Sequence, residues 1–349
     1  MPLTVQEIEN ATNAGIAYHF QRGNVKSQSL QNKPLLKALR AKQKTFPGGV
    51  SIITRRVKFA YTTTIMGFEG DDVVSYANPT NIRTCNYPWK MIHAGISFTK
   101  DELLKNGITI SDSLDGTGDR STARAELIRL ANVLEDKLDD MEEGWNRGFN
   151  LMFWLDGTQD PKVVPGIRSF VVDAPTTSTA VVGGVDQIAN PLWQNRSVLG
   201  INTSGLPGDQ LVVQKLQNEM RQLRRYGGNP NLALCGSAFL DWMEQELRAK
   251  GNYTLEGWAN RGKIDASVAD VEFKGISFEY DPTMDDIGLT KRLFLLDTRT
   301  IYPMVIDGED EQKHAPARPE NRYVFYRAMT WAGGLVCDQR NANGVYSIL

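Results

Sequence analysis

The chain has 349 residues, 41% of them hydrophobic, and a net charge of −2 at neutral pH, so it is long enough for two domains or one large domain with a substantial core. The balanced charge excludes a protein that binds nucleic acid or an anionic membrane through its overall charge. No apolar run reaches the ~18 residues of a membrane-spanning helix, and three widely spaced cysteines, Cys85, Cys235 and Cys337, are typical of a reduced compartment.

Residues 1–45 contain few large apolar side chains. A short amphipathic helix is predicted from Val5 to Phe20, followed by a polar, basic stretch that Pro34 interrupts. Such a segment cannot build its own core, so we expect an arm that is ordered only by docking on another surface. It has no basic stretch followed by an apolar core, and no secretory signal is expected.

Residues 48–76 are rich in β-branched and aromatic residues that alternate with polar ones, and they include four glycines. This pattern predicts a long β-hairpin that Asn78-Pro79 closes. Because a two-stranded hairpin is marginally stable and leaves exposed edges, it needs a partner surface. The stretch from Met1 to Phe68 has ten Lys and Arg against two acids, so the rest of the chain is acidic.

The element that organises the chain is a helix predicted over residues 121–155. A strand at 89–98 and a short helix at 101–105 precede it. Its large apolar residues recur at steps of three and four, which places them on one helical face, with Gly148 as the position that lacks a side chain. These residues are Leu127, Ala131, Leu134, Leu138, Met141, Trp145 and Met152. An acidic block follows the same helix: Glu135, Asp136, Asp139, Asp140, Glu142 and Glu143.

After residue 156 the pattern changes to short strands and turns at 163–172, 179–182 and 199–201, followed by a second α/β unit. We expect its helices at 210–226 and 238–250, and its strands at 232–235, 271–280, 292–297 and 300–306. The tail is interpreted as two strands around a turn at Gly333-Gly334, with Asn343-Gly344 as the last turn.

Motifs that carry chemistry are largely missing. Neither a Walker-type nor a dinucleotide-binding glycine loop occurs, and the histidines His19, His93 and His314 are scattered. The acidic block could bind divalent cations, as in a metal-dependent hydrolase, but that would require further ligands from elsewhere. A solvated or partner-facing helix surface is the better interpretation. We therefore predict no catalytic residue, no cofactor, no metal and no enzyme activity.

Several motifs, taken in order, resemble tailed-bacteriophage major capsid proteins. Gly184-Val185-Asp186 and the stretch Asn-Pro-Leu-Trp-Gln-Asn at 190–195 are similar to an early A-domain motif, although Gln194 stands where arginine is common. The helix at 216–223 and the stretch Gly-Gly-Asn-Pro-Asn-Leu at 227–232 are similar to the family's helix, glycine turn and buried strand. Residues 273–276 with 280–282 and 293–297 resemble the family's sheet, and residues 332–337 with 344–345 its closing strands.

The resemblance covers nearly the whole chain and implies an α+β fold of the HK-ninety-seven type. Its parts are an N-terminal arm at 1–45, an extended β-hairpin (E-loop) at 46–84, a P-domain with spine helix and sheet at 85–157, an α/β A-domain at 158–299, and returning strands shared by both domains at 300–349. The spine helix is the one predicted over 121–155.

The resemblance also implies the function of a structural protein that assembles as hexamers and pentamers into the icosahedral head of a bacteriophage around double-stranded DNA. Expected partners are further copies of itself, a separate scaffolding protein, a portal, possible decoration proteins and DNA that is contacted non-specifically; no membrane partner is expected. The protein would be part of the virion capsid, assembled in the host bacterial cytoplasm without a large N-terminal cleavage. Encapsulin compartments share this fold and stay an alternative, with the metal-dependent hydrolase as a remote one.

The charges suggest where subunits meet. We expect Arg55, Arg56 and Lys58 on the hairpin to face Glu142 and Glu143 on the long helix of an adjacent subunit. Each exposed pair would contribute only ~0–1 kcal/mol. Repeated at every subunit contact, such pairs would fix the register of assembly.

Overall fold

The computed structural model describes residues 3–4, 31–59, 63–76, 81–105, 110–111, 120–177, 181–203, 211–249, 272–314 and 324–349, with backbone only at 3–4, 103, 110–111, 120–136 and 247–249. The chain divides into two compact units. The first unit comprises Met1–Gln31, Met91–Phe149 and Gly308–Ala332, and the second comprises Asn32–Lys90, Asn150–Asp307 and Gly333–Leu349. The predicted helix from Val5 to Phe20 lies outside the described residues.

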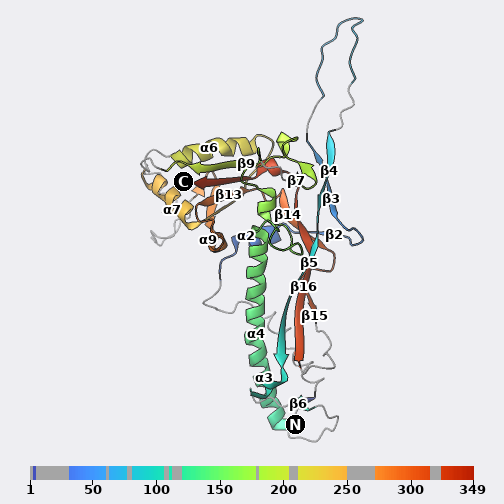
Figure 1. The fold of residues 1–349 in the computed structure, drawn as a ribbon, viewed down its shortest axis with the longest axis vertical. Helices are drawn as coiled ribbons and strands as arrows, with labels where there is room; N and C mark the ends of the chain where they lie inside the picture. The colour runs from blue at the N-terminus through green and yellow to red at the C-terminus, as the bar shows by residue number, and fades with distance from the viewer. Residues whose placement is uncertain are drawn as a thin grey trace. The chain divides into compact units, whose positions relative to one another are not determined.

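The first unit is built around α4 (Arg120–Trp154), which confirms the predicted long helix to within one residue at each end. The other elements that contribute to this unit are β1 (Leu3–Thr4), β5 (Lys90–Thr99), α3 (Lys100–Lys105), β6 (Ile110–Ser111), β15 (Gln312–His314) and β16 (Val324–Cys337). β1 pairs parallel with β6, while β16 pairs with β5 and antiparallel with β15 (Figure 1).

Burial along α4 follows the predicted apolar face wherever side chains are described. Leu138, Met141 and Trp145 are buried, as is Met152 further along. Phe149 packs edge-on against Trp331 of β16 with ring centroids 5.0 Å apart. The face that is apolar in the sequence is therefore the face that the helix buries.

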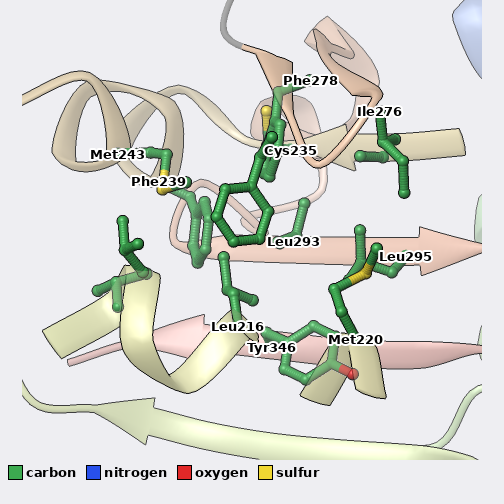
Figure 2. Packing of buried hydrophobic residues seen from close by; sticks show 14 of the residues in the cluster. Leu216, Met220, Cys235, Phe239, Met243, Ile276, Phe278, Leu293, Leu295 and Tyr346 are labelled. Carbon is green, nitrogen blue, oxygen red and sulfur yellow. The ribbon is translucent and has the colours of Figure 1, made fainter. Parts of the chain in front are cut away.

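The second unit contains a six-stranded mixed sheet in the order β11-β12-β10-β13-β17-β9. Its strands are β9 (Arg196–Ile201), β10 (Leu232–Cys235), β11 (Glu272–Phe273), β12 (Ile276–Tyr280), β13 (Arg292–Leu296) and β17 (Gly344–Ile348). Helices α6 (Leu211–Arg224) and α7 (Ser237–Ala249) share one hydrophobic core with it. Figure 2 shows this core, where Leu216 of α6, Phe239 of α7 and Tyr346 of β17 converge.

The carboxyl-terminal end of α4 belongs to this second unit and is fixed by buried polar groups. The Asn150 side-chain amide donates to the Thr283 hydroxyl at 2.8 Å and accepts from the Leu36 backbone N–H at 3.1 Å. The Trp154 indole N–H donates to the Asp281 carboxylate at 2.8 Å. Since such groups are costly to bury without partners, this network specifies how the helix end packs.

A second set of strands in this unit pairs β14 (Ile301–Ile306) antiparallel with the end of β16 and parallel with β2 (Lys44–Phe46). Here the expectation of an arm over 1–45 needs a correction. Pro34 does not interrupt the chain but begins helix α2 (Pro34–Arg40), where proline is favoured because the first helical N–H needs no partner. Leu35 and Leu39 of α2 are almost fully buried, so this part of the segment is integrated into a core.

Two further local predictions were wrong. Residues 163–172 contain no strand but a helical turn, α5 (Ile167–Phe170). The Gly333-Gly334 pair is not a turn, because β16 runs through it. A Cβ at Gly334 would lie 2.6 Å from the Pro88 carbonyl oxygen, so the glycine permits close backbone packing.

The remaining elements are short. They are β3 (Ile53–Lys58), β4 (Ile82–Tyr87), β7 (Val181–Val182), β8 (Val185–Asp186), the 3-10 turns η1 (Pro191–Trp193) and η3 (Arg340–Ala342), and α9 (Pro282–Asp286). β7 and β8 form a small antiparallel pair, and η1 carries the conspicuous Asn-Pro-Leu-Trp stretch of the sequence.

Candidate functional site

The β3–β4 hairpin is the candidate functional site because it combines an anchored base with an exposed loop. β3 and β4 pair antiparallel from Ile53 with Tyr87 to Lys58 with Ile82. β4 therefore lies beyond Asn78-Pro79, where the sequence was expected to close the hairpin. The described residues between the two strands, 63–76, carry no strand pairing and lie beyond the paired ends of β3 and β4 (Figure 1).

Arg55 anchors β3. Its guanidinium donates two hydrogen bonds to the Asp338 carboxylate, at 2.9 and 3.0 Å, and the Tyr302 hydroxyl donates a third at 2.7 Å. The Lys44 ammonium lies 3.7 Å from the centre of the Tyr302 ring. Burial opposes ionisation of Asp338, but the hydrogen bonds from Arg55 and Tyr302 outweigh it and lower the pKa of Asp338. A charged, bidentate contact therefore fixes the base of the hairpin.

Tyr87 anchors β4 in the same way. Its buried hydroxyl donates to the Cys337 carbonyl at 2.5 Å, and its ring packs edge-on against Phe170 with centroids 5.6 Å apart. Next to β3, Phe59 packs edge-on against Trp193 with centroids 5.3 Å apart. Both strands of the hairpin are thus held by aromatic and polar contacts within the second unit.

The loop at 63–76 is exposed and carries several large apolar side chains. Glu69 and Asp72 close a turn at its centre, where the Asp72 carboxylate accepts from the Glu69 N–H at 2.9 Å. On either side, Ile65 and Val73 are 103% and 94% exposed, and Phe68 is 69% exposed. Among the described residues, exposed large apolar side chains gather in this hairpin: Val50, Ile52, Ile65, Met66, Phe68, Val73, Tyr76 and Ile82. Such a concentration is characteristic of a surface that another protein covers.

The structure separates the three hairpin cations. Strand alternation places Arg55 on the same face as the buried Ile53, whereas Arg56 and Lys58 are exposed on the opposite face. Arg55 already binds Asp338 within its own chain. A contact of Arg55 with an adjacent subunit would therefore compete with Asp338. Arg56 and Lys58 lie on the outward face.

The two predicted acidic partners on α4 also have neighbours in the first unit. Glu143 forms an ion pair with Arg147, one helical turn away, at 2.8 Å. Glu142 is exposed and lies close enough to Lys313 to affect its pKa. Burial lowers the pKa of Lys313, and the negative charges of Glu142 and Glu311 offset only part of this effect. Their charges are partly balanced within the chain, which reduces what each could contribute to a subunit contact.

Sequence reasoning missed a buried cation beside the hairpin base. The side chain of Arg340 is 1% exposed, and its guanidinium donates to the Phe170 carbonyl at 2.7 Å, the Gln187 side chain at 3.1 Å and the Asn195 side chain at 3.2 Å. No carboxylate pairs with it in the described part of the chain, and burial lowers the pKa of Arg340 to about 10. Asn195 belongs to the stretch singled out in the sequence, but its partner 145 residues away leaves no local signal.

The described residues offer no alternative chemical centre. Within them, no group of three His, Cys, Asp or Glu side chains could hold a metal ion, and Glu135 and Asp136 of the acidic block lie outside the described side chains. The cysteines Cys85, Cys235 and Cys337 are buried and free, as expected. In the same described part of the chain, no helix has the length and apolar character that crossing a membrane requires.

No protein-family model matches the sequence, and no curated protein matches it. Solved structures do share its fold. The capsid asymmetric unit of cyanophage A-1(L) gives a TM-score of 0.61 at 14% identity, covering 93% of this chain and 95% of that chain. The capsid of cyanophage P-SCSP1u gives 0.53 at 8% identity, covering 94% and 91%, and the capsid of Myoviridae phage XM1 gives 0.51 at 10% identity, covering 93% and 95%.

At these identities the likeness concerns the fold, and it extends over nearly the full length of each chain. The α+β architecture expected from the motifs is confirmed: the chain has the shell fold of tailed-bacteriophage major capsid proteins.

Proposed function

We propose that the chain is the major capsid protein of a tailed bacteriophage, which assembles as hexamers and pentamers into an icosahedral head around double-stranded DNA. The observation that carries this proposal is the likeness to phage capsid structures over more than nine-tenths of the chain, at 93% coverage for cyanophage A-1(L). In this proposal the chain has a structural role and no catalytic one. Scaffolding protein, portal and decoration proteins belong to the same proposal as partners, with the virion as location and the host bacterial cytoplasm as the place of assembly.

In this proposal the second unit supplies the A-domain, through its six-stranded sheet and helices α6 and α7. The first unit supplies the P-domain, through α4 and the strands β5, β15 and β16. The hairpin serves as the E-loop. The predicted arm is reduced to the residues before α2, because α2 belongs to a core.

The exposed loop gives a physical reason for assembly. Ile65, Val73 and Tyr76 lose almost no surface to their own chain, and Phe68 stays 69% exposed. Burying a large apolar side chain against a neighbour would contribute ~1.5–3 kcal/mol. The anchored base sets the direction in which the loop leaves the subunit, so less freedom is lost when it docks. We propose that this loop lies on a second copy of the chain.

The sequence predicted that Arg55, Arg56 and Lys58 contact an adjacent subunit, and we now assign this role to the two outward cations. Arg56 and Lys58 lie on the exposed face of β3, and we propose that they meet the acidic face of a neighbouring α4 near Glu142 and Glu143. Arg55 fixes the hairpin to its own subunit. Reversal of Arg56 and Lys58 to Glu is expected to impair assembly without unfolding the subunit.

Electron microscopy of the purified chain tests the proposal. The wild type is expressed alone and together with a scaffolding protein, and we expect it to form rings or closed shells. We expect soluble folded subunits from the double variant Phe68→Ser, Val73→Ser. The matched control is Val181→Ser, which removes a 61% exposed apolar side chain from β7. A wild-type chain that stays monomeric in both preparations would refute the proposal, and a protein cargo instead of DNA in the native particle would indicate an encapsulin-type shell.

A further inference from the structure

Helix α6 presents an exposed face that carries only positive charge. Its apolar residues face the core, and Glu219, its only acid, is buried and bound by Arg196 of β9 through two hydrogen bonds of 2.9 Å. The exposed positions carry Lys215, Arg221 and Arg224, and Arg225 follows directly after the helix. No ion pair joins these four cations to a carboxylate within the described part of the chain, and we call them the α6 basic face.

A cavity of about 270 Å³ adjoins this face. Its lining combines Pro191 and Leu192 with the polar side chains of Arg196, Gln222 and Arg225. Tyr226 also lines it and is 50% exposed. The basic face is therefore not a smooth surface but has a recess beside it that could receive a protruding segment of a protein partner.

An acidic surface gathers around β12, near the opposite edge of the six-stranded sheet from β9. It comprises Asp241 and Glu244 of α7, Glu279 of β12, and Asp285 and Asp286 of α9, and we call it the α9 acidic edge. The Tyr280 hydroxyl donates to Asp285 at 2.8 Å, and this bond, with the nearby charges of Asp286 and Asp281, raises the pKa of Tyr280 to about 12. The carboxylates thus gather around one end of β12.

Sheet topology keeps these two surfaces apart within one subunit. The strand order runs from β11 and β12 at one edge to β9 at the other. Arg196 ties α6 to β9, whereas the acidic edge is built on β12 and its neighbours. Two complementary surfaces on opposite edges of one unit match the requirement of a head-to-tail contact, in which each copy uses a different patch toward each neighbour and the contacts can close into a ring.

We propose that the α6 basic face of one copy docks on the α9 acidic edge of a second copy. This proposal rests on the proposed function, since it names the contact that would join subunits within a ring. The occupant is inferred from charge complementarity: the same chain that exposes cations on α6 exposes Asp241, Glu279 and Asp286 elsewhere. A near-neutral chain with separated charges is suited to binding itself in one orientation, because wrong orientations bring like charges together.

The contact can be tested by exchanging the signs of its two halves. The first variant carries Lys215→Glu, Arg221→Glu and Arg224→Glu, which makes its α6 face negative, and the second carries Asp241→Lys, Glu279→Lys and Asp286→Lys, which makes its α9 edge positive. All six positions are exposed, so both variants should keep the wild-type circular dichroism and melting temperature. We expect each variant alone to lose ring formation at protein concentrations where the wild type assembles. The control, Lys37→Glu with Lys42→Glu, reverses two exposed cations on and next to α2 and should assemble.

An equimolar mixture of the two variants gives the decisive result. Every mixed contact again joins opposite charges, whereas contacts between identical variants repel. The mixture should therefore form rings in which the variants alternate, and alternation permits six-membered but not five-membered rings. We expect sixfold rings without closed icosahedral shells by electron microscopy.

The failures of the two proposals are distinguishable. If both variants assemble alone, or the mixture does not restore rings, the α6 contact is refuted while self-assembly of the wild type still stands. If the first variant forms normal rings but no longer shifts a double-stranded DNA oligonucleotide in a gel, the α6 face binds nucleic acid and the proposal is overturned. A wild type that forms no rings refutes the proposed function; the contact is then decided by ultracentrifugation, where association of the mixture but of neither variant supports it and no association overturns it.

Discussion

The contact between Arg55 and Asp338 predicts a specific loss of stability. Arg55→Ala removes two charge-assisted hydrogen bonds of 2.9 and 3.0 Å and leaves Asp338 with the Tyr302 hydroxyl. Hydrogen bonds to charged groups contribute ~1.5–3 kcal/mol when they are desolvated. The two side chains are 36% and 33% exposed, so solvent screening reduces this, and we expect a coupling free energy of ~1–2 kcal/mol between them.

The pH dependence has a definite sign. The pKa of Asp338 is lowered in the folded chain, so its stabilising contribution is complete above the unfolded-state pKa of roughly 3.9. The contribution is lost as the pH falls through the lower, folded-state pKa. Asp338→Asn should therefore reduce the free energy of unfolding near neutral pH and flatten its dependence on pH in the acid range.

The assay is urea denaturation of unassembled subunits, for Arg55→Ala, Asp338→Asn and the double variant. Arg56→Ala is the matched control, because this residue lies next in sequence on the exposed face of β3 and should change stability by less than ~0.5 kcal/mol. A coupling below ~0.5 kcal/mol in the double-mutant cycle would refute the idea that this pair anchors the hairpin.

Four further substitutions test the packing by the same denaturation assay. Gly144→Ala and Gly148→Ala in α4 should each stabilise the subunit by ~1 kcal/mol, because no described atom lies within 4 Å of either added Cβ; destabilisation would show that the helix needs these glycines. Gly334→Ala should cost ~1–3 kcal/mol, since its Cβ would lie 2.6 Å from the Pro88 carbonyl oxygen, and an unchanged urea midpoint would contradict this. Arg340→Met should cost ~3 kcal/mol because buried acceptors lose their donor, and a more stable variant would show instead that burying the charge outweighs its hydrogen bonds.

The sequence predicted most accurately the elements whose apolar residues follow a regular local pattern. The long helix was found because its apolar residues recur with the helical period from Leu127 to Met152, and α4 differs from the prediction by one residue at each end. The helices α6 and α7 were located for the same reason, whereas β10 was located as a short, continuously apolar run. Sequence pattern and burial coincide in these elements, so pattern alone was sufficient.

Errors arose where one residue type serves two purposes. Residues 63–76 have strand composition, yet most of their large apolar side chains are exposed and the segment forms no strand with the described residues. Composition alone does not distinguish these cases. Gly334 was interpreted as a turn, although it lies within β16 and lets this strand approach the backbone at Pro88. Pro34 was interpreted as a break, although it begins α2.

The anchor of the candidate site could not be read from the sequence at all. Arg55 and Asp338 lie 283 residues apart, and the buried Arg340 binds groups 145 to 170 residues away. Such pairs are set by the tertiary fold and leave no local periodicity. The sequence did identify Arg55, but as a residue for a neighbouring subunit rather than for the chain's own hairpin base.

Two of the proposed subunit contacts, the apolar loop and the α6 basic face, should respond to different conditions, which separates them experimentally. The loop around Phe68 would bind through apolar surface, and hydrophobic contacts weaken on cooling. The α6 basic face would bind through exposed charges, which salt at about 1 M screens to a Debye length of ~3 Å. We expect high salt to dissociate contacts that depend on Arg221 and Arg224 while preserving those that depend on Phe68, and cooling at low salt to do the reverse. Light scattering on the wild type, on Phe68→Ser and on Arg221→Glu measures both responses. If high salt and cooling reduce the scattering of all three proteins to the same extent, the assignment of separate apolar and charged contacts is wrong.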